Sequence, residues 1–540
     1  MGSTRPFCRS LSGILDRLSG HRFGTVEPTH YRAPMPEPTT SSSPRSARHR
    51  RSPRILVIGA GFGGLGLAMA LRRAGHDRVT ILERADDVGG VWRDNTYPQA
   101  ACDVPSSLYS WSFAPQPTWS RRYSQQPDIL SYIRRTAEEE GVLAAVRTGV
   151  EVTAATFDDA TRVWHVDTAS GERFEAEVLV PAVGQLSQPS IPSIPGAEAF
   201  AGTAFHSARW RHDVDLTGKR VAVVGTGASA IQFVPGIVDD VGAMTVFQRS
   251  APYVVPKPDR AYTGLHHRAF ERWPATQQVG RRLTRSLSEW FNRSFEQGGV
   301  LQPVLRATWQ ATLWAQVRDA DLRERLVPDY PLGCKRVLFS NDWYPALDRD
   351  HVDVVTDDIV EVRPEGLLTA DGRLHEADVI IWGTGFAATR FLDGIDVTGR
   401  EGLDLHDVWA DGARAHLGLA VPGFPQLFVM YGPNTNLGGS SIIQMLEAQA
   451  SWIVQVVDAI AEGRVGCVDV RADVAGAYDA EMQERLGESI WSACTSWYTD
   501  GGRITTNWPG LVAEYEQRLA RVDFDELVEV AVPATAGGAL

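Results

Sequence analysis

The chain has 540 residues, of which 43% are hydrophobic and 22% are charged, and its formal net charge is −13. This composition is ordinary for a globular protein, and the length suggests about three or four domains of usual size. The acidic balance argues against a general nucleic-acid binder, because such proteins neutralise phosphates with clustered Lys and Arg. No run of about 18 apolar residues occurs, so we predict no membrane span.

The first 52 residues are rich in Arg, Ser and Pro and poor in acids. The stretch PMPEPTTSSSPRS has no periodic apolar pattern, so we expect a disordered leader. Three origins stay open for it: an unstructured tail, a targeting segment of the Arg- and Ser-rich kind, or a mis-assigned start with Met35 as the true first residue.

The next segment, residues 54–64, reads RILVIGAGFGG and leads into a helical pattern and a second strand, RVTILE. Gly59 permits a tight turn, Gly61 lets the backbone approach a pyrophosphate, and Gly64 lets the helix pack on the strand. Glu83 ends the second strand, where a carboxylate can accept ribose hydroxyls. We therefore predict a first dinucleotide site that prefers free ribose hydroxyls, as in FAD.

The stretch that follows Glu83 is expected to lie against the same ligand. The pair Gly89 and Gly90 permits close approach of the backbone. Asp103 is the one acid in a long apolar and hydroxyl-rich stretch, so we expect a cation opposite it, because a buried carboxylate needs a partner. Four flat side chains either wall a ring system or pack in the core: Trp92, Tyr97, Tyr109 and Trp111.

Residues 220–250 repeat the same plan of strand, glycine-rich turn, helix and strand. The turn positions are Gly225, Gly227 and Ala230. Arg249 stands where Glu83 stands in the first unit, and a guanidinium there suits a 2′-phosphate. The second site is therefore predicted to take NADPH, although Arg249 as a solvated surface charge is the alternative. Two such sites imply electron transfer between two cofactors.

Four later segments bear on the site. Residues 256–330 have a helical pattern and are expected to form a helical insertion that helps to shape the substrate cavity. Lys335 and Arg336 are adjacent, so in extended backbone one can hold a phosphate while the other points into the site. Residues 378–389 read as a buried strand ending in Gly-Thr-Gly, and residues 427–441 as a strand that runs into a Gly/Asn-rich loop suited to covering a flavin ring.

The cysteines predict little chemistry. The five are Cys8, Cys102, Cys334, Cys467 and Cys494. None forms a C-x-x-C pair, so zinc and dithiol redox motifs are not expected. Few cysteines in a long chain fit a reducing compartment, and we expect a cytoplasmic protein.

Between the two nucleotide units lies FAGTAFHSARW, residues 200–210, which matches the fingerprint F-x-G-x-x-x-H-x-x-x-W. With GGVW, CD-V-x-x-x-x-Y, KR, GTGF and SWY, it makes the chain resemble the type I Baeyer–Villiger monooxygenases, which are class B flavoproteins. The resemblance covers about residues 53–520. It implies an α/β fold with two Rossmann-like dinucleotide-binding domains, for FAD and NADPH, and a helical insertion in the NADPH domain. The domains expected are the leader 1–52, the FAD domain in two parts, 53–190 and 381–540, and the NADPH domain 191–380.

The resemblance also implies a reaction. NADPH reduces FAD, O2 adds to give a C4a-peroxyflavin, and this converts a ketone into an ester or lactone. Arg336 and Asp103 are the catalytic residues that the resemblance implies: Arg336 would stabilise the anion, and Asp103 would orient Arg336 and keep the peroxide deprotonated. Lys335 and Arg249 would hold the 2′-phosphate, while Trp497 would lie against NADP⁺ and substrate. The expected cofactor-binding residues are Gly59, Gly61, Gly64, Glu83, Gly90, Val91, Trp92, Asp103, Tyr109, Gly225, Thr226, Gly227, Ala228, Ser229, Ala230, Arg249, Ser250, Lys335, Arg336 and Trp497.

The fingerprint histidine, His206, is expected to couple domain positions and not to do chemistry. The chain departs from the family pattern at three places. Arg211 follows the fingerprint Trp where Pro or Asp is usual, and Gln99 and Ala101 replace the Gly and Arg common in the Y-P-G-x-R-C-D stretch. The replacements at Gln99 and Ala101 are expected to alter one edge of the nicotinamide site.

Three alternatives remain beside this interpretation. One is a flavin monooxygenase that oxygenates nitrogen or sulfur. Another is a pyridine-nucleotide disulfide reductase, which the missing C-x-x-C disfavours, and the third is a flavin-binding redox sensor, which Arg336 and Asp103 disfavour. The expected partners are a small ketone and O2, with aryl, cyclic or long-chain ketones suggested by the aromatic-rich loops. The physiological substrate and the oligomeric state are left open.

Overall fold

A computed structural model of the chain describes residues 51–292, 302–494 and 496–531. The expected leader, residues 1–52, lies outside the described residues except for its last two positions. The described residues all belong to one unit, which begins at Arg51.

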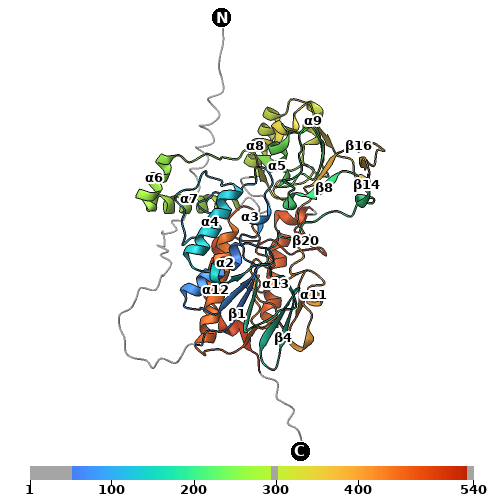
Figure 1. Cartoon of the computed structure of the whole chain (residues 1–540). Helices are drawn as coiled ribbons and strands as arrows, with labels where there is room; N and C mark the ends of the chain where they lie inside the picture. The colour runs from blue at the N-terminus through green and yellow to red at the C-terminus, as the bar shows by residue number, and fades with distance from the viewer. Residues whose placement is uncertain (1–50, 293–301, 495, 532–540) are drawn as a thin grey trace, which may run out of the picture. The chain divides into compact units, whose positions relative to one another are not determined.

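Four short parallel strands form the sheet that carries the first glycine-rich turn (Figure 1). Their order across the sheet is β3 (Val146–Arg147), β2 (Val79–Leu82), β1 (Ile55–Ile58) and β7 (Val178–Pro181). All residues of β1 and β7 are buried, as expected for parallel strands that are covered on both faces. β1 leads into α2 (Phe62–Arg73), and the long helix α12 (Ile442–Ala461) packs on α2. The predicted order of strand, turn, helix and strand is therefore present.

Five parallel strands form a second sheet, which carries the second turn. Their order is β13 (Val352–Val355), β10 (Ala243–Phe247), β9 (Arg220–Val224), β17 (Val379–Trp382) and β8 (Thr203–His206). β9 leads through the turn into α5 (Ala230–Ile237). Because β17 pairs with both β9 and β8, the boundary that we expected between 380 and 381 cuts a strand of this sheet. The other domain boundaries stay predictions.

Smaller sheets accompany these two, and side chains of β4 and β5 share a hydrophobic core with β1 and β2. One has β18 (Asp396–Thr398), β4 (Val152–Asp158), β5 (Val163–Thr168) and β6 (Arg173–Ala176), and another has β14 (Ile359–Arg363), β15 (Gly366–Thr369) and β16 (Leu374–Glu376). Two pairs lie near the C-terminus, β19 (Val468–Val470) with β22 (Leu527–Glu529) and β20 (Thr499–Asp500) with β21 (Arg503–Ile504). Antiparallel pairing dominates here, and alternate residues of β5 are buried, which is the pattern of strands with one covered face.

Helices occupy most of segment 256–330. They are α6 (Gly264–Arg272), α7 (Pro274–Asn292), α8 (Gln302–Gln316) and α9 (Ala320–Arg325). Just outside this segment, β11 (Val254–Val255) pairs in parallel with β12 (Leu338–Phe339), so its two ends lie side by side. That the segment is an insertion of the NADPH domain stays a prediction.

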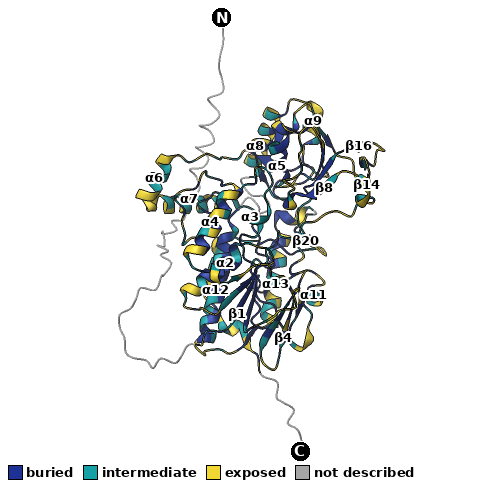
Figure 2. Cartoon of the chain, viewed as in Figure 1, coloured by how far each residue is buried: buried dark blue, intermediate teal, exposed yellow. Residues whose placement is uncertain are grey.

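The remaining helices surround the sheets. They are α3 (Val91–Asp94), α4 (Gln126–Glu139), α10 (Trp343–Leu347), α11 (Leu405–Val408), α13 (Ala472–Gly487) and α14 (Val512–Leu519). Figure 2 shows β1 and its neighbouring strands as buried and the outer faces of the surrounding helices as exposed. Within the described ranges, no helix combines the length and apolarity needed to cross a bilayer.

The strand that we predicted at the start of LFVMYGPNTNLGGSS is not formed as such. Leu427 makes a single bridge to Leu179 at the edge of the first sheet, and Phe428 makes another single bridge. Gln426 and Tyr431, on either side, have φ of 53° and 58°. This left-handed backbone is incompatible with a continuous strand, so a ladder cannot extend in either direction.

Candidate active site

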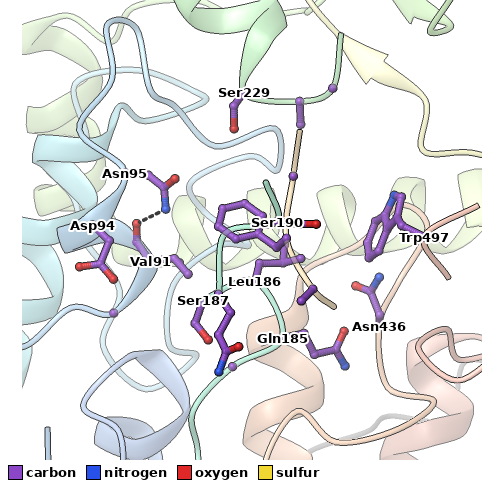
Figure 3. Close-up of a pocket in the computed structure, with 18 of the residues that line it drawn as sticks. Val91, Asp94, Asn95, Gln185, Leu186, Ser187, Ser190, Ser229, Asn436 and Trp497 are labelled. Atoms are coloured by element: carbon purple, nitrogen blue, oxygen red, sulfur yellow. Dashed lines mark hydrogen bonds between the residues drawn. The ribbon is translucent and has the colours of Figure 1, made fainter. Parts of the chain in front are cut away.

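One cavity of about 1240 Å³ lies at the carboxyl ends of the strands of both parallel sheets. Its volume exceeds the usual range for one drug-sized ligand, so it has room for more than one ligand. Figure 3 shows part of its lining, with Val91 of α3 and Asn95 just after that helix in the same close-up as Asn436 and Trp497. The cavity thus draws residues from the whole length of the described chain.

The first glycine-rich turn has the geometry that a pyrophosphate needs. Gly59 has φ of +104°, and a Cβ there would lie 2.7 Å from the Ala182 carbonyl oxygen. A Cβ on Gly90 would lie 3.2 Å from Cα of Gly61, so the two glycine backbones face each other at the cavity wall. Gly64 does not line the cavity, and a Cβ there would lie 1.9 Å from a backbone oxygen. This contact fits the helix–strand packing that we expected of Gly64, and its place among the cofactor-binding residues stays a prediction.

Glu83 lies where β2 ends and reaches back to this turn. Its carboxylate accepts hydrogen bonds from the backbone N–H groups of Ala60, at 2.9 Å, and Ala85, at 3.0 Å. Arg93 lies 3.1 Å from the same carboxylate. Each oxygen has further lone pairs, and Glu83 lines the cavity, so the group can also accept ribose hydroxyls.

The second turn repeats this geometry with one difference. Gly225 has φ of +106°, and a Cβ there would lie 2.4 Å from the Gly383 carbonyl oxygen. A Cβ on Gly227 would meet no atom within 4 Å, because this position opens into the cavity. Ala230 is fully buried and does not line the cavity, which fits a packing role, and its place among the cofactor-binding residues stays a prediction.

Both turns present helix N-termini to the cavity. The first residues before α2 and α5 are Gly61 and Ser229, and neither caps its helix with a side chain. The leading N–H groups are therefore left for an anion, and the helix dipole favours negative charge there. Two dinucleotides fit the donor sets of these two turns.

Two cations line the cavity near the end of β10: Arg249, which follows that strand, and Lys335. The Lys335 ammonium donates to the hydroxyl of Ser250 at 2.9 Å and lies 4.4 Å from the ring centroid of Tyr330. Burial lowers the pKa of Lys335, and the nearby charge of Arg249 lowers it further, against the opposing effect of Asp329. Two cations this close to each other favour a ligand that carries at least one negative charge.

Arg336 contacts a different group from Lys335. Its Nη2 and Nε donate to one carboxylate oxygen of Asp103 at 2.6 and 3.1 Å. This is the cation expected opposite Asp103, and both residues line the cavity. The charge of Asp103 raises the pKa of Arg336. Burial by itself would raise the pKa of Asp103, but the charge and hydrogen bonds of Arg336 outweigh that effect, so the pKa of Asp103 is lowered. The pair is therefore fully ionised, and among the described residues no hydrogen bond engages Nη1 of Arg336.

The aromatic residues after the first turn divide into two groups. Trp92, Tyr97 and Tyr109 line the cavity, and the Trp92 indole donates to the Tyr109 hydroxyl at 3.0 Å. Trp111 is fully buried and packs against Phe62 at a centroid distance of 4.8 Å. For Trp111 the core interpretation therefore holds, because its ring lies beneath α2 and not at the cavity.

Trp497 lines the cavity and is 39% exposed, and its ring lies 4.3 Å from that of Tyr498. The loop that carries it is tied to the segment before Lys335 by a disulfide between Cys334 and Cys494, whose Cα atoms are 6.1 Å apart. We did not expect a disulfide, because the two cysteines are far apart in the sequence and form no C-x-x-C motif. The cysteine count and spacing therefore did not identify this pair.

The fingerprint lies on β8 and the turn after it. A Cβ on Gly202 would lie 2.4 Å from a backbone oxygen and 2.6 Å from the ring of Phe200, so only glycine fits. His206 is buried, its Nδ1 accepts from the Ala208 N–H at 3.1 Å, and burial lowers its pKa. It lies outside the cavity lining. Trp210 packs against the rings of two neighbouring phenylalanines. These contacts give the fingerprint a structural basis, and its coupling role stays a prediction.

Gln99, which stands where the family has glycine, has φ of 62°. Its backbone thus keeps the left-handed conformation that glycine tolerates, with the strain that a side chain adds. Ala101, in place of arginine, lines the cavity and exchanges two hydrogen bonds with the Gln232 side chain, at 3.0 and 3.1 Å. The cavity edge is therefore uncharged at position 101.

Sequence reasoning missed the loop after β7. Gln185, Ser187 and Ser190 line the cavity (Figure 3), and the Gln185 amide donates to the Tyr431 carbonyl at 3.0 Å. The available signal was the buried strand VLVP, because loops at the carboxyl ends of parallel strands line dinucleotide sites. The same rule applies to residues 357–359 after β13.

Comparison with known proteins agrees with this geometry. The family model described as pyridine nucleotide-disulphide oxidoreductase matches residues 56–263, less than half of the chain. A Baeyer–Villiger monooxygenase of Streptomyces coelicolor is 42% identical over 488 residues, covering 89% of this chain and 93% of that protein. A Pseudomonas aeruginosa protein of the same name is 38% identical over 489 residues, covering 90% and 92%.

Solved structures point the same way. A steroid monooxygenase bound to NADP has a TM-score of 0.80 at 30% identity, covering 88% of this chain and 99% of that one. The enzyme named OTEMO, in complex with FAD and NADP, has a TM-score of 0.80 at 28% identity, covering 88% and 100%. These likenesses do not favour the nitrogen- and sulfur-oxygenating alternative. With relatives this similar along nearly its whole described length, the chain belongs to the FAD- and NADPH-dependent Baeyer–Villiger monooxygenases.

Proposed function

We propose that this enzyme inserts one oxygen atom of O2 between the carbonyl carbon and a neighbouring carbon of a small ketone, with Arg336 as the catalytic residue. The balanced reaction consumes ketone, O2, NADPH and a proton and yields an ester or lactone, NADP⁺ and water. When bound and reduced by NADPH, FAD would supply the chemistry that activates O2 for transfer of one of its oxygen atoms. The observation that carries the proposal is the ionised Asp103–Arg336 pair in the wall of a cavity built from both dinucleotide turns.

Arg336 acts as a fixed positive charge. A guanidinium stays protonated at every physiological pH, so it stabilises negative charge that develops beside it without giving up a proton. Asp103 engages Nε and Nη2 and leaves Nη1 for the reacting groups. A charge held in this way needs no reorganisation during the reaction, which is the usual source of large electrostatic stabilisation. Asp103 is thus a positioning residue.

The cofactor roles follow from the donor sets. Gly59, Gly61, Gly90 and Glu83 would hold FAD, and the second turn would hold the pyrophosphate of NADPH. Arg249, Lys335 and Ser250 would supply two charges and a hydroxyl for the 2′-phosphate. The Lys335–Ser250 hydrogen bond and the effect of the Arg249 charge on the pKa of Lys335 support this role. Trp497 is proposed to lie against the nicotinamide and the substrate.

We keep two further expectations as part of this proposal. The FAD domain is formed by two parts of the chain on either side of the NADPH domain, with the second boundary placed after β17. The enzyme is proposed to work in the cytoplasm, which the low cysteine content supports; the Cys334–Cys494 bond is the feature that an oxidising compartment would favour.

The test is turnover of the FAD-loaded enzyme with NADPH, ¹⁸O2 and a panel of aryl, cyclic and long-chain ketones, with a thioether and an amine alongside. We expect NADPH consumption that rises with ketone, and an ester or lactone that carries one ¹⁸O atom. Arg336→Lys should lose ester formation while the flavin is still reduced by NADPH. Stoichiometric hydrogen peroxide with every ketone, or labelled product from the thioether or amine alone, would contradict the proposal.

A further inference from the structure

Exposed apolar side chains gather on α6, α7 and the residue between them. Six of them are more than half exposed: Leu265, Trp273, Val279, Leu283, Leu287 and Trp290. We call this set the α6–α7 face. Figure 2 shows much of α6 as exposed. Single exposed hydrophobic residues are normal, but a cluster of this size marks a surface that meets a partner.

On α7 the apolar residues form one stripe. Val279, Leu283 and Leu287 follow one another at intervals of four, and Trp290 comes three residues later. At these spacings side chains lie one above the other on the same side of a helix. The stripe is therefore continuous along most of the helix.

The charged side of α7 faces the protein. The Arg281 guanidinium donates to the carbonyls of Ser107, at 2.7 Å, and Ser110, at 3.0 Å, and Arg285 pairs with Glu516. In an ordinary surface helix the apolar side packs on the core and the charges meet water. Because α7 has the opposite orientation, its stripe is left without a partner inside the described chain.

The charge around the stripe is positive, although the whole chain is acidic. α6 and α7 carry five arginines and two glutamates, against a formal net charge of −13 for the chain. Arg268, Arg272 and Arg282 are exposed, and Glu271 is the exposed acid among them. Leu and Trp beside exposed arginines on an amphipathic helix are the features of a helix that lies in a membrane interface.

The α6–α7 face is linked to the cavity. A Cβ on Gly439 would lie 2.7 Å from Cδ1 of Phe291, so the end of α7 packs directly on this loop. The same loop carries Leu437 and Ser440, which line the cavity. A surface held by α7 is therefore held close to a loop of the active site.

We propose that the α6–α7 face docks on the surface of an anionic phospholipid bilayer. The apolar stripe enters the boundary between headgroups and acyl chains, and the exposed arginines contact lipid phosphates. The proposed contact is at the membrane surface, and no helix among the described residues is long and apolar enough to cross a bilayer. Docking does not require the proposed reaction, so it can be measured without turnover.

A second copy of the chain is a poorer occupant. A two-fold interface would bring the same patch of each copy together, and with it six exposed arginines and only two exposed acids. Like charges brought together across an interface oppose association, whereas anionic lipid neutralises them.

The experiment is co-sedimentation of the full-length FAD-loaded enzyme with vesicles of phosphatidylcholine alone or mixed with phosphatidylglycerol. We expect binding to the mixed vesicles that weakens as salt is raised, because added salt screens the arginines. The double variant Leu283→Gln/Leu287→Gln should lower the affinity roughly tenfold or more, since it removes apolar surface that would be buried in lipid. Val360→Gln, at an exposed valine of β14, is the matched control and should bind as the parent does.

Three results would overturn the inference. The first is equal sedimentation of the parent and the double variant, and the second is no sedimentation of the parent with either vesicle. The third is a concentration-dependent dimer in light scattering that the double variant dissociates, which would assign the face to a second copy. Bound FAD and the far-ultraviolet spectrum show that each variant is folded, and turnover is measured separately, so failure of the proposed reaction leaves this test intact.

Discussion

Asp103→Asn removes the charge opposite Arg336 while keeping the size of the side chain. The shortest contact of the pair is 2.6 Å, and the side chains are 23% and 29% exposed. Two unit charges at that distance attract each other by about 6 kcal/mol at an effective dielectric constant of about 20 and by about 1.6 kcal/mol in bulk water. Breaking a buried pair on one side typically costs about 3–5 kcal/mol, so a loss of roughly 3 kcal/mol of stability is expected for this partly exposed pair.

Asp103→Asn should also lower the rate of ester formation by more than its loss of stability can account for. Asp103 raises the pKa of Arg336, but without it the guanidinium is still protonated near neutral pH, so the variant keeps the positive charge. What it loses is the orientation of that charge. Removing one well-placed electrostatic donor costs about 10²–10³ in kcat. We expect that loss in ester formation, and little change in the anaerobic rate of flavin reduction by NADPH in stopped-flow absorbance.

The chain offers a matched control. The Arg503 Nη2 donates to both carboxylate oxygens of Asp479 at 2.6 and 2.8 Å, and these side chains are 27% and 20% exposed. Neither residue lines the cavity. Asp479→Asn should therefore lower the thermal midpoint about as much as Asp103→Asn and leave ester formation unchanged. If Asp103→Asn kept its turnover within about threefold of the parent, or if both variants lost it equally, the electrostatic reasoning would be refuted.

Three further predictions concern other parts of the site and the fold. Arg249→Ala should raise the KM for NADPH by roughly 10- to 100-fold, which corresponds to the loss of one charge-assisted hydrogen bond, and should leave the KM for NADH unchanged. An equal rise in both KM values would contradict a 2′-phosphate contact. Replacing Cys334 and Cys494 by serine should lower the apparent thermal midpoint, since a cross-link across 160 residues is worth up to about 5 kcal/mol of chain entropy. A reductant should lower the midpoint of the parent and not that of the serine variant. An unchanged midpoint in both experiments would speak against the disulfide. Burial raises the pKa of Asp469 to about 6 from 3.8, so the native state favours the protonated carboxyl. The contribution of this group to stability is therefore fully present below pH 3.8 and is lost as the pH rises through about 6. Asp469→Asn should therefore gain roughly 3 kcal/mol relative to the parent between those limits in denaturant titrations, and parallel stability curves would exclude the shift.

Some of the site could be predicted because its chemistry is local. Gly59 and Gly225 need positive φ, and both turns follow buried strands, so a short stretch of sequence specifies each turn. The exchange of Glu83 for Arg249 separates the two sites by charge alone. The need of Asp103 for a cation follows equally from one residue and its apolar neighbours.

The tertiary structure decided what depends on distant residues. The partner of Asp103 lies 233 positions away in the chain, and the disulfide joins cysteines 160 positions apart, so no local pattern identifies either pair. The loop after β7 and Trp497 meet only because the two sheets present their carboxyl ends to one cavity. The periodicity of α7 marks an amphipathic helix, but which side faces water depends on the acceptors at Ser107 and Ser110 that take its arginine. Backbone sterics and the charge of a position depend on a few neighbouring residues, so a short segment determines them. Contacts between distant segments depend on how the sheets pack, and that packing is a property of the whole chain.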